Sequence, residues 1–269
     1  MMAHAWLAFW LLLTATTVGA VAWKAIHSLT GGAWGDALAP AMLGMRRLLP
    51  VAAMVGLPLL IGAAHVFPWI DVPAEPARRW YLNYPFLAYR TIGCFLAWGI
   101  AWRLCRRAPA VSLIIWLFAC GVFGTDWIVS LTPAWRSADI GLVVALGQLV
   151  ISFAAAVLAS GRVIEERDDG IRRDLGGLLL ALCLGWAYLA GIDYLTAWMA
   201  DQPYETAWYL PRITGAWGML AMAALILHLV LPSGMLLSRT AKQKPRVLRT
   251  ACVSVLLGHA SYLTWMVLP

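Results

Sequence analysis

Five ionisable side chains interrupt segments of this sequence that are otherwise apolar. They are Arg90, Asp126, Asp193, His228 and His259. Leaving a charge unpaired in hydrocarbon costs on the order of several kcal/mol, so such residues are rare inside membrane spans. Where they do occur they mark ion pairs, proton paths or ligand sites. Each of the five is therefore a candidate functional residue.

Three of these residues are predicted to share one depth in a membrane. At a rise of about 1.5 Å per residue, Arg90 lies about a turn and a half into its helix. Asp126 and Asp193 lie a similar distance from the ends of theirs, on the same side of the membrane. We expect the arginine and the two carboxylates to meet there. Either they form an ion pair that only fixes helix packing, or the second carboxylate takes up and releases a proton.

His228 and His259 lie near the middle of two consecutive predicted helices. Three interpretations stay open for them: axial ligands of a b-type haem, members of a proton relay, or packed and hydrogen-bonded core residues. The sequence contains no nucleophile elbow, P-loop or dinucleotide-binding glycine motif. The five cysteines form no CxxC pair, so we expect buried thiols with no disulfide and no zinc.

The composition favours a membrane protein. The 269 residues are 62% hydrophobic and only 12% charged, about half the charged fraction of a typical soluble domain. Many of the 16 Trp residues flank apolar blocks, as expected at a membrane interface. The net charge of +7 comes from basic residues in short loops, not from a basic domain, which argues against a nucleic-acid partner.

The apolar blocks define the expected elements. Each is about as long as a membrane-spanning helix requires, and short polar connections separate them. The sequence therefore predicts an all-α integral membrane protein, one polytopic domain over 1–269, with about eight transmembrane helices in packed helical bundles. The predicted helices are about 5–26, 48–67, 85–103, 109–131, 140–160, 175–199, 213–237 and 249–267.

The basic residues also predict an orientation. The first, third, fifth and seventh loops hold 14 Lys and Arg residues, whereas the alternate loops hold four, namely Arg78, Arg79, Arg136 and Arg212. Because positive loops stay in the cytoplasm, an even number of spans places both termini in the periplasm. We expect a multi-pass protein of a bacterial inner membrane.

Four stretches together carry a resemblance to a known family. They are RRWYLNYPFLAYR (78–90), TDWIVSLTPAW (125–135), RDLGGLLLALCLGWAYLAGIDYLTAWMADQPYETAWYL (173–210) and KPRVLRTACVSVLLGHASYLTWMVLP (244–269). In this order they resemble the ActF-type membrane subunit of alternative complex III, the bacterial quinol:cytochrome c oxidoreductase. That subunit is related to the NrfD/PsrC membrane proteins.

The resemblance implies a function and partners. It implies an accessory subunit of a respiratory electron-transport complex, beside an NrfD-like quinol-binding subunit, an iron–sulfur subunit and c-type cytochromes, with lipids around it. It implies no cofactor held by this chain, although a quinone or quinol remains an open ligand. Arg90, Asp126 and Tyr194 fall in the matching motifs, so they are proton-path candidates together with Asp193. His65, at the outer end of a predicted helix, is a candidate for contact with a quinol head group.

The chain also departs from the family pattern. Thr132 and Ala134 replace an acidic residue and a histidine near Pro133, and Asp193 replaces an amide. The chain looks about one helix shorter at each end. These differences favour a shortened, largely structural subunit over one that carries a complete proton path. A haem b anchor that uses the two histidines and a small secondary transporter remain the alternatives.

Overall fold

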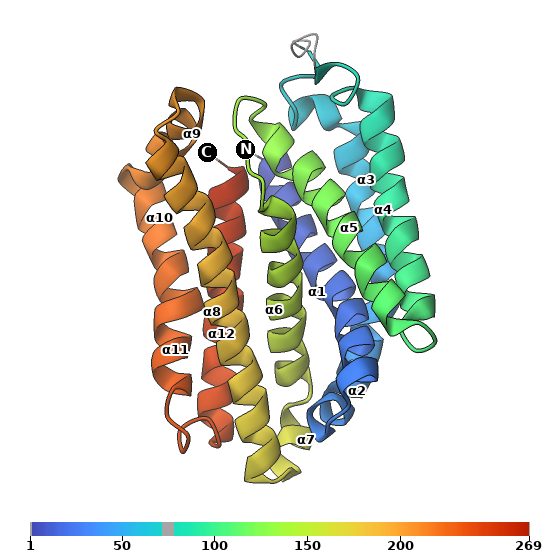
Figure 1. Ribbon diagram of the computed structural model, residues 1–269, viewed down its shortest axis with the longest axis vertical. Helices are drawn as coiled ribbons and strands as arrows, with labels where there is room; N and C mark the ends of the chain where they lie inside the picture. Colours follow the sequence, from blue (N-terminus) through green and yellow to red (C-terminus); the bar gives the residue numbers. More distant parts are fainter. Residues whose placement is uncertain (1, 72–77, 269) are drawn as a thin grey trace.

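The computed structural model describes residues 2–71 and 78–268, and over these ranges the protein is helical with no strand (Figure 1). The helices are α1 (Met2–Thr30), α2 (Ala33–Arg47), α3 (Leu49–Ile61), α4 (Tyr84–Leu104), α5 (Pro109–Trp127), α6 (Ile140–Ala159), α7 (Gly161–Glu166), α8 (Asp169–Ala200), α9 (Pro203–Ile213), α10 (Gly215–Leu225), α11 (Leu231–Leu236) and α12 (Pro245–Val267). The described residues also include two 3-10 turns, Ala63–His65 and Val129–Leu131, and a π turn, Ile226–Val230.

Seven of the described helical segments are long and apolar enough to cross a membrane, consistent with the predicted class of multi-pass helical membrane protein. They are α1, α2 with α3, α5, α6, α8, α10 with α11, and α12. Helix α4 has 21 residues, which is long enough, but it is not among those seven. The start of α1 and the end of α12 lie at the same end of the molecule (Figure 1).

The predicted second helix, 48–67, is wrong in its bounds. Helix α3 ends at Ile61, and its 13 residues cover only about 20 Å, too little for a membrane. The segment becomes long enough because α2 precedes it with only Leu48 between them. Sequence reading missed α2 because Asp36, Pro40 and two arginines make it look like a loop.

Helix α8 begins six residues before its predicted start at residue 175. The side chain of Asp168 accepts a hydrogen bond from the Ile171 amide at 2.9 Å and so caps the helix. The charged loop before it therefore contributes the first turns of α8. Helix α9, in the connection that follows α8, was also absent from the prediction.

Helices α1 and α6 form the centre of the molecule, between α3, α4 and α5 on one side and α8, α10, α11 and α12 on the other (Figure 1). The crossing of α1 over α6 is close because Gly19 has no side chain. A Cβ atom there would lie 2.0 Å from the Gln148 carbonyl oxygen. Gln148 in turn accepts hydrogen bonds from Trp116 and Cys120, which ties α5 to the same point.

We expect Gly19→Ala to destabilise the protein by about 1–3 kcal/mol, because the new methyl group overlaps backbone that cannot move away. Thermal unfolding of the purified chain in detergent measures this. Gly93→Ala on α4 is the matched control, since a Cβ at Gly93 meets no atom within 4 Å. Equal melting temperatures for the two variants would contradict this account of the crossing.

Candidate functional site

Helix α4 begins in a way that places Arg90 against α5. The Asn83 side chain accepts a hydrogen bond from the Phe86 amide at 3.0 Å, and Pro85 lies in the first turn, so the start of the helix is well fixed. Further along the helix, the Thr91 hydroxyl accepts a hydrogen bond from the Trp127 indole at 3.0 Å. This contact joins α4 to α5 directly beside the candidate ion pair.

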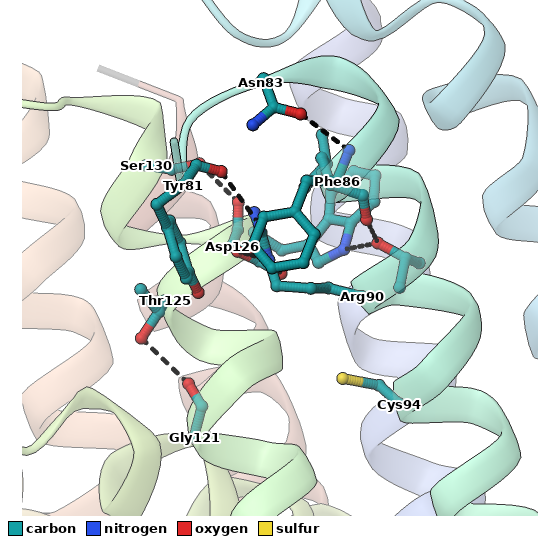
Figure 2. Close-up of polar contacts among 12 residues, drawn as sticks. Tyr81, Asn83, Phe86, Arg90, Cys94, Gly121, Thr125, Asp126 and Ser130 are labelled. Carbon is teal, nitrogen blue, oxygen red and sulfur yellow. Dashed lines mark hydrogen bonds and ion pairs between the residues drawn. The ribbon is translucent and has the colours of Figure 1, made fainter. Parts of the chain in front are cut away.

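The Arg90 and Asp126 side chains form a salt bridge between α4 and α5 (Figure 2). The Arg90 Nε atom lies 3.0 Å from Asp126 Oδ1 and 2.8 Å from Oδ2. The exposed fractions of the two side chains are 9% and 1%. The predicted meeting of these two residues is therefore present, and each charge neutralises the other away from water.

Two aromatic rings also contact the guanidinium group. Its central carbon lies 3.8 Å from the centre of the Tyr81 ring and 4.3 Å from that of Phe86. A second nitrogen of Arg90 donates to the Tyr81 carbonyl at 2.9 Å. Burial, and then the negative charge of Asp126, raises the pKa of the Tyr81 phenol. The arginine is thus held by cation–π contacts as well as by its counter-ion.

This arrangement is typical of a structural ion pair. Both oxygens of the Asp126 carboxylate contact the same Arg90 nitrogen, and the side chain is almost completely buried. The geometry favours the first interpretation of the pair, an electrostatic lock between two helices.

Asp193 does not join this pair, so the expectation that all three residues meet is wrong. Its carboxylate instead accepts hydrogen bonds from the Tyr209 hydroxyl at 2.6 Å and the Ser137 hydroxyl at 2.7 Å. Helix α8, which carries Asp193, packs against α6, whereas α4 and α5 lie on the far side of α6 (Figure 1). Spacing along a helix predicts depth in the membrane, but it does not predict direction around the bundle.

The second carboxylate site has a more open setting. Asp193, Tyr194 and Tyr209 border a cavity of about 430 Å³ between α8, α9, α10 and α12. The rings of Tyr194 and Tyr209 meet edge to face with centres 5.3 Å apart. Burial, and then the charge of Asp193, raises the pKa of Tyr209. Sequence reading missed Tyr209 and Ser137 because both lie in connections between the apolar blocks.

The two predicted histidines are neighbours in the core. The His228 and His259 ring centres are 5.1 Å apart in edge-to-face contact, and the Trp186 ring lies 3.9 Å from His228. Among the described residues, neither His228 nitrogen has a hydrogen-bond partner, and neither has Nδ1 of His259. Two axial ligands must face a haem from opposite sides, and rings in direct contact leave no space for it.

His65 is exposed and lies in the 3-10 turn that follows α3. It follows the end of one of the seven apolar segments, Ala33–Ile61. Its contact with a quinol head group stays a prediction.

In comparisons with known proteins, no family model matches this chain and no curated protein matches it.

We expect Asp126→Asn to destabilise the protein by about 3–5 kcal/mol, because the Arg90 charge then stays buried without a counter-ion. The double variant Arg90→Met, Asp126→Leu removes both charges and is expected to recover most of that loss. Thermal unfolding in detergent measures both. Glu165→Gln is the control: its ion pair with Arg249 is about half exposed, so it contributes less than about 1 kcal/mol. If the double variant melts at no higher temperature than Asp126→Asn, the proposed role of the ion pair in holding α4 against α5 is contradicted.

His228→Leu tests the packed-core interpretation of the histidines. The substitution removes two buried nitrogens that lack hydrogen bonds among the described residues, so we expect the free energy of unfolding to change by less than about 1 kcal/mol or to increase. A loss of several kcal/mol in the same melting assay would show that the ring binds something essential.

Proposed function

We propose that this chain is an integral membrane subunit of a bacterial respiratory quinol:cytochrome c oxidoreductase of the alternative complex III type. Its role is to complete the membrane arm beside the quinol-binding subunit. One observation carries the proposal. The four sequence stretches that resemble the family are far apart along the chain, yet each contributes side chains to a chain of contacts near one end of the bundle.

The contacts between the stretches are direct. Arg90 of the first stretch binds Asp126 of the second. Trp135, at the end of the second, stacks on Trp208 of the third, with ring centres 4.0 Å apart and planes 9° apart. Trp208 also meets Trp265 of the fourth, at 5.5 Å. Residues that share a motif because of one local structure are expected to lie together, so this clustering supports the resemblance.

We further propose eight membrane crossings with both termini in the periplasm. Ends on the same side require an even number of crossings, so the seven apolar spans need α4 as an eighth. The pairing of Arg90 with Asp126 explains how α4 enters hydrocarbon despite its modest apolar character. On this topology the end where the motifs meet faces the periplasm, where c-type cytochromes lie.

The chain is an accessory subunit in this proposal, with one further role. Asp193 is the better proton-exchange candidate of the two carboxylates, because it borders a cavity and has neutral hydroxyl partners rather than a cation. Proton uptake or release near the outer face would accompany quinol oxidation at the neighbouring subunit.

The alternatives make different demands on the fold. A secondary transporter needs interrupted helices in corresponding halves around a site at the membrane midplane. Interruptions occur here at Leu48 and at the π turn Ile226–Val230, but α2 with α3 and α10 with α11 do not occupy corresponding places in the chain order. A haem anchor needs two histidines with space between them.

Mild detergent extraction tests the proposal directly. A tagged copy of the chain is expected to bring down c-type cytochromes and an iron–sulfur protein in fixed ratio. Purification of the chain alone, with no quinol oxidation by any co-purifying protein, would contradict the proposal. A Soret band from the isolated chain would favour the haem anchor instead.

Asp193→Asn and Asp126→Asn separate the two roles in the assembled complex. The amide introduced by Asp193→Asn would keep hydrogen bonds to the hydroxyl groups but could not exchange a proton, so we expect slower quinol turnover with an altered pH profile. We expect Asp126→Asn to reduce the amount of complex while leaving the pH profile of the remaining complex unchanged. If Asp193→Asn also leaves turnover and pH profile unchanged, only the structural role survives.

A further inference from the structure

A long apolar groove lies between α3 and α4, on the opposite side of the molecule from the Asp193 cavity. Its volume is about 540 Å³. Ile92, Leu96 and Gly99 line it from α4, at the spacing of one helix face, and Arg103 closes that face at one end. The other wall comes from α3, and the ring of Trp10 from α1 lies beneath Gly56.

The length of the groove fits one leaflet of a bilayer. From Thr91 to Arg103 the α4 wall extends about 18 Å. Half of a hydrocarbon core is about 15 Å thick. The groove therefore extends from near the membrane centre to one surface, and its charged end lies at that surface.

Three arginines gather at the charged end. Arg103, Arg106 and Arg107 are exposed and surround one open hollow. None of their guanidinium groups forms an ion pair or side-chain hydrogen bond with another described residue. Beside them the buried Arg46 reaches Cys105 at 3.6 Å, which brings a fourth positive charge close. The cluster lacks negative charge from the described part of the chain.

We propose that this groove binds an anionic phospholipid, with an acyl chain along α3 and α4 and its phosphate on Arg103, Arg106 and Arg107. Basic pockets beside membrane helices on the cytoplasmic side recognise acidic head groups. The proposal is independent of the respiratory assignment.

The distribution of polar groups favours a lipid over a helix of a partner subunit. The groove wall is apolar along its length, and the charged side chains lie at the arginine end. This pattern matches a molecule with one charged head and a long apolar tail.

Lipid retention by the full-length chain tests the proposal. The protein is exchanged into detergent, incubated with dioleoyl phosphatidylglycerol or dioleoyl phosphatidylcholine, and examined by native mass spectrometry. Because the two lipids have the same acyl chains, a difference in their retention reports the effect of the head group alone. We expect the wild type to retain the anionic lipid at least about fivefold better, the effect of roughly one arginine at a membrane surface.

Two kinds of variant separate the head-group site from the groove. Changing Arg103, Arg106 and Arg107 to Gln is expected to abolish the preference. Gly99→Leu fills the groove where an added Cβ meets no atom within 4 Å, so we expect it to fold and to lose both lipids. Gly93→Leu, on α4 outside the groove, is its control. The charge control changes to Gln three exposed basic residues between α11 and the first turn of α12, namely Arg239, Lys244 and Arg246.

Several outcomes would overturn the proposal. They are equal retention of the two lipids by the wild type, the same loss of preference in the charge control, or unchanged retention in Gly99→Leu. The arginine variants lie on the exposed surface, so their result stands even where Gly99→Leu reduces the yield of folded protein.

Discussion

The cost of placing polar groups in hydrocarbon is the constraint that organises this protein. Burying either Arg90 or Asp126 alone would cost free energy, but their side chains lie 2.8 Å apart and neutralise each other. The consequence reaches beyond the pair. Helix α4 is not among the seven described segments that are apolar enough to span a membrane, and the ion pair offsets the cost of burying its arginine beside α5. The pair adds to the other contacts between these two helices, such as the hydrogen bond from Trp127 to Thr91.

Asp193 answers the same constraint in another way, with two hydroxyl donors in place of a cation. Hydroxyl groups stabilise a carboxylate without fixing its charge, since they can also accept from its protonated form. An arginine cannot, because it has no acceptor. The two aspartates were expected at similar depth, yet they have different chemistry, which follows from their partners rather than from their position along the membrane normal.

The parts of the fold that could be predicted are those that depend only on the order of residues along the chain. Long apolar blocks identify spans directly, and most helix bounds agree within a few residues. The failure at 48–67 arose because α2 is amphipathic and contains Pro40, so half of a span resembled a loop.

Only part of the candidate site could be predicted, for a related reason. Depth follows from counting residues along a helix, so the match of Arg90 with Asp126 could be expected. Direction around the bundle depends on which helices become neighbours, and α6 separates Asp193 from that pair.

The histidine pair marks the limit of residue-type reasoning. His228 and His259 drew attention because histidine in a membrane is rare, yet their rings pack against each other and Trp186 as flat aromatic groups. Close helix packing makes this possible, since a Cβ at Gly258 would lie 2.5 Å from the His228 backbone nitrogen. The π turn around His228 widens the helix by one residue at the same level. A residue type that can ligate or transfer protons needs partners for its nitrogens in those roles, and here the backbone geometry brings the edge of one imidazole ring against the face of the other.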